Sequence, residues 1–290
     1  MDWGSAIIVT QVSKFLLEQG YGCSVTVVPS ATTPALASVA ETGEPDILTE
    51  LWTNGVPAYD GLVEEGKLIE LTKVLSDGGV EGVWVPKYMA EEHPELATIE
   101  GILANPELVG GRFHNCPVGW TCQRIGNNLS KAGGFEAAGV EVFEHGSGET
   151  LAASIASAYD AKEPWFGYYW APTSVLGKYP MVLVDLGGND IEAHECNRQE
   201  ECATPKLNNW PASDVVTVVT DTFAESHPAE TELMSKMSFS NELMSGLLAW
   251  QEQNGASGEE TAVYFLTNNK DMWAGWLNDD ARAKLSALLQ

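Results

Sequence analysis

The order of helical and strand-like segments near the start of the chain most constrains its fold. Residues 7–19 carry apolar side chains at helical spacing and end at Gly20, and residues 25–28 then read as a strand that Pro29 ends. A second helix is predicted over residues 34–41 and a second strand over residues 46–52. A strand, a helix and a strand in this order predict a parallel sheet covered by helices, and so an α/β fold.

The rest of the chain continues this alternation and predicts two lobes. A chain of 290 residues with 44% hydrophobic content can bury a large core, and domains commonly hold roughly 100–200 residues. The middle section carries long loops rich in Gly, Pro and aromatic residues, which fits two α/β lobes better than a barrel. Further strands are predicted over 140–143, 181–184 and 215–220, and further helices over 150–162, 230–236, 259–265 and 273–289.

The charge of the chain excludes several classes of partner. Lys and Arg number 15 against 41 Asp and Glu, which gives a net charge of -26 that repels phosphate backbones and anionic bilayers. We therefore expect no nucleic-acid partner. No run approaches the roughly 18 consecutive apolar residues that a membrane span needs. Met1 is followed directly by Asp2-Trp3-Gly4-Ser5, which fits either a cytosolic protein or a mature secreted chain.

Two pairs of cysteines bear on that choice. Cys116 and Cys122 bracket five residues, and Cys196 and Cys202 bracket another five. Such local pairs are typical of disulfides, which persist in oxidising compartments, so the spacing favours a secreted protein; whether Cys196 and Cys202 pair stays open. Zinc is the alternative for the second pair, because His194-Glu195-Cys196 together with Cys202 and the distant His114 could supply four ligands, although zinc sites usually space paired cysteines more tightly. Cys23 is interpreted as a small buried apolar residue.

Four tryptophans lie beside turn or strand signals and are candidates for one aromatic box: Trp3, Trp52, Trp120 and Trp170. Trp120 lies between Cys116 and Cys122, where a short disulfide loop would hold its ring rigidly. Ring faces attract a methylated cation, whose methyl groups also favour leaving water. The alternative is that these side chains fill the core, as several of the ten tryptophans must.

A carboxylate and a tyrosine accompany these rings. Side chains alternate along a strand, so Glu50 shares a face with Trp52, at the strand end where ligands gather in parallel sheets. The alternative for Glu50 is a solvated charge at the strand end. Tyr168 and Trp170 alternate onto one side of the aromatic stretch 164–172, so that one of them lines the pocket and the other packs beneath it.

Several stretches together resemble the substrate-binding components of ABC importers for glycine betaine, choline and related methylated amines. The resemblance covers nearly the whole chain, and its motifs occur in the family's order. They are Gly119-Trp120-Thr121-Cys122, Leu51-Trp52-Thr53, Tyr168-Tyr169-Trp170-Ala171-Pro172, Met237-Ser238-Phe239-Ser240-Asn241, and Phe265-Leu266 through Trp273-Ala274-Gly275-Trp276-Leu277.

This resemblance implies a two-lobed periplasmic-binding-protein fold of type II, with the ligand in the cleft between the lobes. We expect one lobe from residues 1–106 and 223–290 and the other from residues 107–222. Trp52, Trp120 and Trp170 match the family's cage, and Trp3 matches an aromatic residue of some members. The amides around Thr121 and Cys122 match donors to an anionic ligand group. The implied protein is a periplasmic monomer that delivers its ligand to the transmembrane permease subunit and needs no cofactor.

One departure from the family bears on the ligand. Betaine binders of this type often carry a histidine a few residues beyond the first cage tryptophan, but residues 52–57 here read Trp-Thr-Asn-Gly-Val-Pro. This disfavours a carboxylate ligand. The cysteine-flanked loop resembles that of trimethylamine N-oxide binders, and we expect that ligand ahead of glycine betaine, choline or dimethylsulfoniopropionate.

Two other site types are open from the residues. A hydrolytic enzyme would use His145 with Glu149, or His114 with Cys116, but the chain has no phosphate loop, nucleophile elbow or His-Glu-x-x-His motif, so we expect no enzyme. The acidic stretch Asp185, Asn189, Asp190 and Glu192 offers oxygen ligands for calcium without the spacing of a helix-loop-helix hand. A metal site is left undecided.

Overall fold

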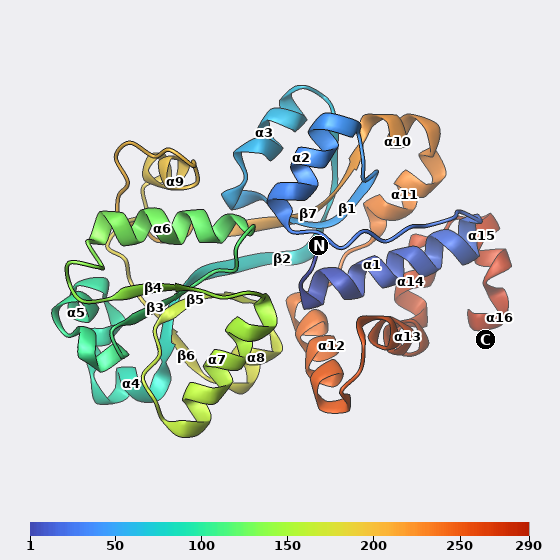
Figure 1. Ribbon diagram of the computed structural model, residues 1–290. Helices are drawn as coiled ribbons and strands as arrows, with labels where there is room; N and C mark the ends of the chain where they lie inside the picture. The colour runs from blue at the N-terminus through green and yellow to red at the C-terminus, as the bar shows by residue number, and fades with distance from the viewer. Residues whose placement is uncertain (290) are drawn as a thin grey trace. The chain divides into compact units, whose positions relative to one another are not determined.

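The computed structural model describes residues 1–289, which form two compact units (Figure 1). Unit 1 contains residues 1–53, residues 58–78 and the chain from residue 214 onward, and unit 2 contains residues 54–57 and 79–213. The chain passes from unit 1 to unit 2 within one long strand, β2 (Leu68–Pro86). Within residues 1–289, no helix has the length and apolar content to cross a membrane.

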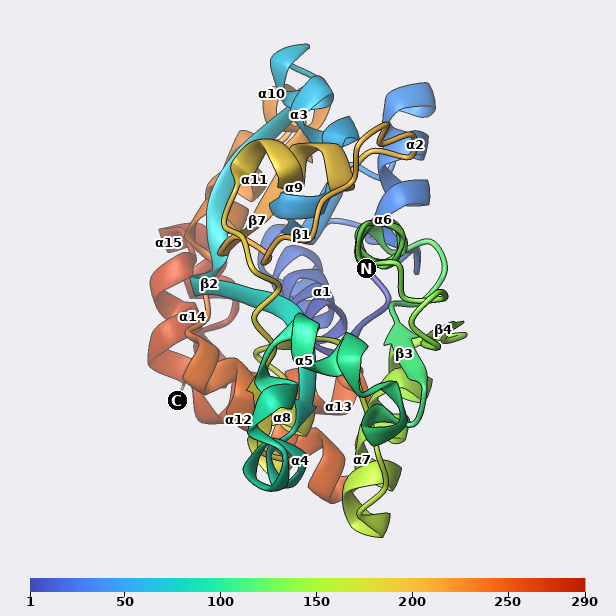
Figure 2. The same ribbon diagram turned by 90° about the vertical axis from the view of Figure 1, so that its left-hand side faces the viewer.

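Unit 1 is mainly helical, with β1 antiparallel to β7, and β7 in turn beside β2. Helix α1 packs on β1 and on α13 (Figure 2). Its buried face carries Ile8, Val12 and Leu16. Because α1 packs on β1, the first residues of the helix lie next to this strand. The elements are α1 (Gly4–Leu16), the π-helical turn η1 (Leu17–Tyr21), α2 (Thr32–Thr42), β1 (Ile47–Trp52), α3 (Pro57–Glu64), β7 (Ser213–Thr220), α10 (Asp221–Ser226), α11 (Pro228–Lys236), α12 (Asn241–Asn254), α13 (Gly258–Asn268), α14 (Lys270–Trp276), α15 (Asp279–Lys284) and α16 (Ser286–Leu289).

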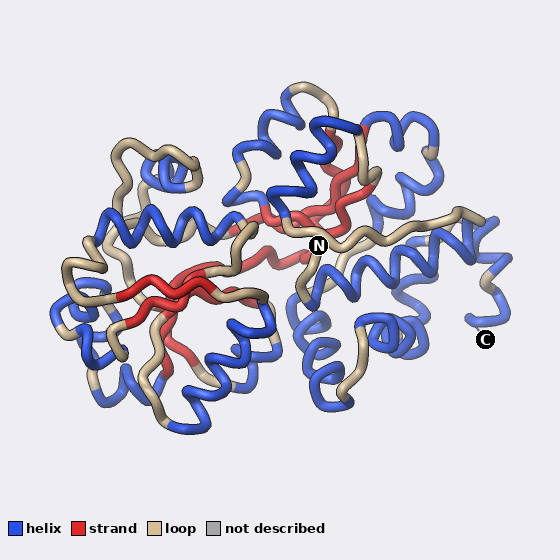
Figure 3. The backbone as a smooth tube through the Cα atoms, in the orientation of Figure 1, coloured by secondary structure: helices blue, strands red, loops and turns tan. Residues whose placement is uncertain are grey.

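Unit 2 has a mixed sheet in the order β2–β5–β3–β4, with β6 also beside β2. The pairs β2–β5 and β2–β6 are antiparallel, whereas β3 is parallel to β4 and β5. Figure 3 shows α6 along one side of β3 and β4 and α7 on the other side. The elements are η2 (Thr53–Gly55), α4 (Lys87–Glu92), η3 (Pro94–Ala97), α5 (Ile99–Ala104), η4 (Pro106–Val109), β3 (Arg112–Asn115), α6 (Thr121–Gly133), β4 (Glu141–Glu144), α7 (Gly148–Ala161), β5 (Gly167–Ala171), α8 (Ser174–Lys178), β6 (Met181–Leu183) and α9 (Ile191–Asn197).

The predicted strand over residues 25–28 is wrong. These residues form a loop, and Val28 is 58% exposed, because no neighbouring strand pairs with the segment in the described part of the chain. The second predicted strand exists as β1, but its partner β7 is antiparallel, so the expected parallel pair is absent from this place. The parallel pairs β3–β4 and β3–β5 lie in unit 2. The last predicted helix, 273–289, is divided among α14, α15 and α16.

The division of the chain also differs from the sequence-based one. The sequence placed residues 79–106 with the first lobe and residues 214–222 with the second, but the structure packs them in unit 2 and unit 1, respectively. The reason is β2, whose second half pairs with β5 and β6 and so draws the following helices α4 and α5 into unit 2. Residues 68–86 carry no regular alternation over their full length, which hid this strand in the sequence.

Candidate functional site

The first group of candidate residues, the Glu50 cluster, lies in unit 1 and consists of Trp3, Ser5, Glu50 and Trp52. Oε1 of Glu50 accepts the indole N–H groups of Trp3 at 2.6 Å and Trp52 at 3.0 Å. It also accepts the hydroxyl of Ser5 at 2.9 Å. Trp3 precedes α1 and Ser5 lies in its first turn, so the packing of α1 on β1 brings both to the strand that carries Glu50 and Trp52.

The carboxyl group of Glu50 is in an unusual state for a charged side chain. It is 0% exposed, which rules out the solvated strand-end charge considered from the sequence. Burial raises the pKa of Glu50, while the hydrogen bonds from Trp3, Trp52 and Ser5 oppose that rise. Its second oxygen, Oε2, is buried and has no hydrogen-bond partner within the described residues. A buried acceptor without a partner costs about 1–3 kcal/mol, so Glu50 is a candidate for binding rather than for stability.

The second group, the Trp170 cluster, lies in unit 2 and consists of Trp120, Tyr168, Trp170 and Trp210. The rings of Trp120 and Trp170 meet edge to face, with centroids 5.2 Å apart. Tyr168 lies parallel to Trp170 at 6.2 Å, and Trp210 lies 5.7 Å from Tyr168. All four side chains are at most 9% exposed. Because Tyr168 and Trp170 alternate along β5, both rings stand on one face of the sheet, as the sequence predicted.

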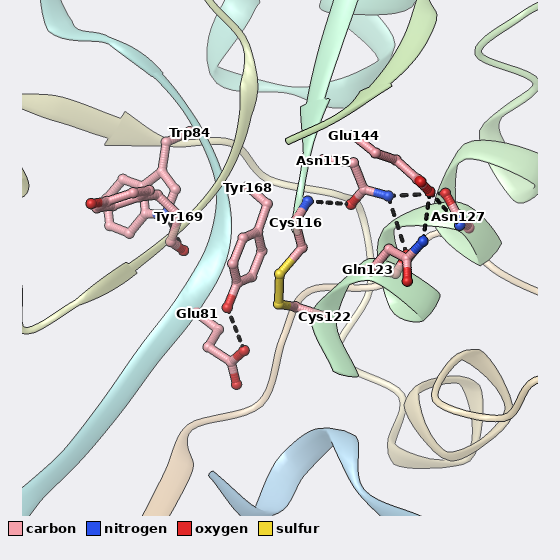
Figure 4. Close-up of a disulfide and its surroundings, with 10 residues drawn as sticks. All are labelled: Glu81, Trp84, Asn115, Cys116, Cys122, Gln123, Asn127, Glu144, Tyr168 and Tyr169. Atoms are coloured by element: carbon pink, nitrogen blue, oxygen red, sulfur yellow. Dashed lines mark hydrogen bonds between the residues drawn. A yellow bond between two sulfur atoms is a disulfide. The ribbon is translucent and has the colours of Figure 1, made fainter. Parts of the chain in front are cut away.

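A second buried carboxyl group accompanies this cluster. Glu81 of β2 lies opposite Trp170 in the antiparallel register, and its Oε1 accepts the hydroxyl of Tyr168 at 2.7 Å (Figure 4). Burial raises the pKa of Glu81 to about 7, with the Tyr168 bond opposing the rise. The pKa of Tyr168 is raised as well, by burial first and then by Glu81. Each unit therefore carries an aromatic cluster with one buried acid.

Both predicted disulfides are present. The bond between Cys116 and Cys122 closes the loop that carries Trp120, and Figure 4 shows it beside Tyr168. Asn115 holds the start of this loop, since its Oδ1 accepts the amide of Cys116 at 2.8 Å. The second bond joins Cys196 and Cys202, which resolves the pairing that the sequence left open.

The loop leads directly into the N-terminus of α6. Trp120 is the residue before the helix, and its own side chain does not cap this end. Thr121 and Cys122 occupy the first two helical positions, where backbone N–H groups point outward along the helix axis. Such an end attracts an anionic or strongly dipolar oxygen. Both predicted donor positions thus follow Trp120 directly in the chain, at the start of α6.

A glycine on α7 is part of the packing around Trp120. A Cβ atom at Gly148 would lie 2.9 Å from Cη2 of Trp120 and 3.8 Å from Cη2 of Trp170. Gly148 opens α7, which Ser147 caps through the amide of Thr150. Glu149, considered with His145 as a catalytic residue, therefore lies in a helix start against which the Trp120 ring packs.

The alternative sites considered from the sequence do not form. Cys116 is bonded to Cys122 and so offers no thiolate for a nucleophile, and Nδ1 of His114 is hydrogen-bonded to Nε2 of His145 at 2.9 Å. Burial, His145 and Arg112 lower the pKa of His114 to about 4.

Residues considered as calcium or zinc ligands have structural roles instead, since Cys196 and Cys202 form a disulfide. Asp190 caps α9 through the amides of Glu192 and Ala193. Within residues 1–289, no three His, Cys, Asp or Glu side chains gather as a metal site. Cys23 is partly exposed, not buried as predicted, and its Sγ lies 3.7 Å from Oε1 of Glu230.

Three residues of these clusters were missed in the sequence. Glu81 follows the pattern Glu81-x-Val83-x-Val85 on one strand face, and a single acid on an apolar face is a usable signal. Ser5 and Trp210 gave no comparable signal. A histidine also reaches the stretch after Trp52: Nε2 of His194 lies 2.6 Å from the carbonyl oxygen of Asn54. Burial lowers the pKa of His194, so it supplies no cationic group at neutral pH.

Comparisons with known proteins identify the family and the fold of this chain. A protein-family model described as the substrate binding domain of ABC-type glycine betaine transport systems matches residues 1–268. A choline-binding protein of an ABC transporter, solved with choline, is 18% identical, with a TM-score of 0.80 over 99% of this chain and 95% of that one. The glycine betaine and L-proline-binding protein ProX from Borrelia burgdorferi is also 18% identical, with a TM-score of 0.80 over 100% and 97% of the chains.

A third solved structure, lactococcal OpuAC with glycine betaine, is 16% identical, with a TM-score of 0.74 over 96% of this chain and 97% of that one. At these identities the similarity shows the fold alone. The fold is the α/β periplasmic-binding-protein fold with a mixed sheet.

Proposed function

This chain belongs to the family of substrate-binding domains of ABC-type glycine betaine transport systems, and from that premise we propose that it captures a small methylated onium compound, with trimethylamine N-oxide as the favoured ligand. Membership makes it the extracytoplasmic, non-enzymatic binding component of an ABC importer for quaternary ammonium compounds. We further propose that it works in the periplasm as a monomer and delivers its ligand to the transmembrane permease subunit.

The observation that carries the proposal is the Glu50 cluster. Two indole rings are oriented about one fully buried carboxyl group whose second oxygen has no partner within the described residues. A methylated cation suits such a place, because aromatic rings attract its charge and the carboxyl group compensates it in a region of low dielectric. A neutral or anionic solute brings no positive charge for the rings and the carboxyl group to compensate.

The Trp170 cluster supports the same ligand class. Trp120 and Trp170 present large, rigid surfaces held by the Cys116–Cys122 bond, the α7 start and the β5 backbone. Glu81 adds a second acid next to these rings. We propose that Trp3, Glu50, Trp52, Trp120 and Trp170 contact the ligand, that Tyr168 supports Trp170, and that the amides of Thr121 and Cys122 receive its oxygen.

The acids bear on which methylated compound binds. A ligand carboxylate, as in glycine betaine, finds no cationic partner in His194, because burial lowers the pKa of that side chain. An amine oxide carries its single oxygen next to its positive nitrogen, so a protonated carboxyl group can donate to that oxygen. The raised pKa values of Glu50 and Glu81 favour this state. Choline is the nearest competitor, because its hydroxyl group can donate to an ionised carboxylate.

The size of the ligand limits its affinity. Trimethylamine N-oxide has about five heavy atoms, and the best small ligands gain roughly 1.5 kcal/mol per atom. Binding therefore saturates near about 7–8 kcal/mol, which corresponds to a dissociation constant of micromolar order. Three or four cation–π contacts at about 1–2 kcal/mol each supply much of this energy.

Calorimetric titration of ligand-free protein tests the proposal, with trimethylamine N-oxide, glycine betaine, choline and dimethylsulfoniopropionate in parallel. We expect micromolar binding of trimethylamine N-oxide, with the compound recovered unchanged. Trp52→Ala and Trp120→Ala should each weaken it about tenfold or more, whereas Trp250→Ala is the control, since Trp250 stacks on Tyr264 outside both clusters. Full affinity in both cluster variants would refute the aromatic site, and a clear preference for glycine betaine would refute the favoured ligand.

A further inference from the structure

We propose that Trp210 is a further ligand-binding residue, and that its indole N–H donates to an oxygen of the bound solute. The inference rests on the proposed function, because it needs a methylated solute that carries an oxygen atom. In this proposal, Trp210 discriminates between such a solute and an onium compound of the same size that has no oxygen.

The state of the Trp210 indole carries this inference. Trp210 is 9% exposed, and its Nε1 is buried without an acceptor among the residues that the structure describes. A buried donor without an acceptor is costly, so folded proteins rarely keep one unless a further partner uses it. Other indole N–H groups of the chain have acceptors at 2.6–3.0 Å, namely those of Trp3, Trp52, Trp84, Trp165 and Trp273.

The place of the ring supplies the second argument. Trp210 lies 5.7 Å from Tyr168, which lies parallel to Trp170, and Trp170 in turn meets Trp120. The unused donor therefore belongs to the aromatic cluster of unit 2. The hydroxyl group of Tyr168 donates to Glu81, and within the described residues its oxygen does not accept this N–H.

The backbone on both sides of Trp210 is fixed, which gives the indole a defined position. On one side, the amide of Asn209 donates to the carbonyl of Gly188 at 2.8 Å, and Oδ1 of Asn209 accepts the amide of Leu186 at 2.8 Å. On the other side, the carbonyl of Pro211 accepts Nδ2 of Asn54 at 2.6 Å. A donor held in place before binding loses little entropy when it meets its acceptor, which favours selectivity.

The chemistry of the N–H group defines the ligand class. An uncharged donor gains most from an oxygen with high negative charge, such as that of an amine oxide, and gains nothing from a methyl group. Tetramethylammonium has nearly the shape of trimethylamine N-oxide, with a methyl group in place of the oxygen. The pair therefore isolates the contribution of the hydrogen bond from that of the aromatic rings.

The experiment compares Trp210→Phe with the wild type by titrating trimethylamine N-oxide and tetramethylammonium. Phenylalanine keeps a ring but lacks the N–H. We expect affinity for trimethylamine N-oxide to fall about tenfold or more, while affinity for tetramethylammonium changes less than about twofold. Trp84→Phe is the matched control, because Nε1 of Trp84 already donates to the Tyr169 carbonyl; both affinities should stay unchanged.

The outcomes separate this inference from the proposed function. If the wild type binds neither compound, the proposed function fails. If it binds both and Trp210→Phe weakens both equally, or neither, the hydrogen bond is refuted. If circular dichroism shows that the variant does not fold, the NMR resonance assigned to Nε1–H of Trp210 in the wild-type protein serves as the test instead. A larger downfield shift with trimethylamine N-oxide than with tetramethylammonium supports the bond, and equal shifts overturn it.

Discussion

Trp3 and Glu50 lie 47 positions apart in the chain, yet the indole N–H of Trp3 donates to Oε1 of Glu50 at 2.6 Å. Trp52 donates to the same oxygen, so a single carboxyl group orients two rings. The arrangement is costly, since the carboxyl group is fully buried and burial raises its pKa. Functional sites commonly keep such destabilising groups because binding needs them.

Glu50→Gln should therefore separate binding from stability. The amide keeps the side-chain size but neither carries a negative charge nor offers a carboxyl O–H to the ligand oxygen, so we expect affinity for trimethylamine N-oxide to fall about tenfold or more. The melting temperature of the ligand-free variant should stay the same or rise, because a buried ionisable group has been removed. Calorimetric titration and thermal unfolding give the two readouts. A less stable variant with full affinity would make Glu50 a structural residue.

Gly148→Ala tests how closely the Trp120 ring depends on the start of α7. The new Cβ atom would lie 2.9 Å from Trp120 Cη2, so the ring must shift, and we expect ligand affinity to fall several-fold. Gly146→Ala is the matched control in the same turn, since a Cβ atom there meets nothing within 4 Å. Equal affinities for the two variants, measured by titration, would show that the Trp120 position is unimportant for binding.

The two clusters show what the sequence could predict. Alternation along a strand placed Glu50 with Trp52 and Tyr168 with Trp170, because a period of two is a local property of the backbone. The spacing of Cys116 and Cys122 indicated their disulfide bond because this spacing, too, is a local property of the sequence. The contact of Ser5 with Glu50 and that of Trp210 with Tyr168 depend on packing between distant segments, which no local pattern encodes.

The errors in the fold have the same origin. Residues 25–28 have the β-branched composition of a strand, but a strand needs a partner, and α1 and α2 leave this segment as a partly exposed loop. The direction of β1 relative to β7 and the extent of β2 are likewise set by strands far away in the chain. Local propensity therefore located several helices, among them α1, α2, α7, α11 and α13, but gave neither sheet direction nor the unit boundaries.

The carboxyl group of Glu81 should make stability depend on pH in a defined direction. Its folded pKa of about 7 lies above the ordinary value of 4.5, so the folded state holds a proton that the unfolded chain releases between these values. The free energy of unfolding therefore decreases as pH rises from about 4.5 to 7, by about 3 kcal/mol at most. The Glu81→Gln variant has no ionisable group at this position, so its free energy of unfolding lacks this pH dependence.

Urea unfolding of ligand-free wild type and Glu81→Gln at pH 5 and pH 8 measures this effect. We expect the variant to gain stability relative to the wild type as pH rises. Cation binding favours ionised Glu81, so the wild-type affinity for tetramethylammonium should rise over the same range while that of the variant changes less. A stability difference that is constant with pH would mean that Glu81 does not titrate in this window.

The two disulfides allow the same covalent change, the removal of one S–S bond, to be compared at two places in the fold. Both close loops with a sequence separation of 6, and such a loop stabilises a fold by about 2 kcal/mol in the chain-entropy account. We expect the double variants Cys116→Ser/Cys122→Ser and Cys196→Ser/Cys202→Ser to lose similar stability. Only the first bond closes the loop that carries Trp120, so only the first variant should also bind trimethylamine N-oxide more weakly.

Unfolding in urea and titration at a temperature where both variants remain folded provide the measurements. Weakened binding in the first variant alone would show that the bond fixes the Trp120 ring and the α6 start for the ligand. Equal affinities in the two variants would show that Asn115 and the packing of Trp120 on Gly148 hold the ring without the bond. In that case the Cys116–Cys122 bond would contribute to stability alone.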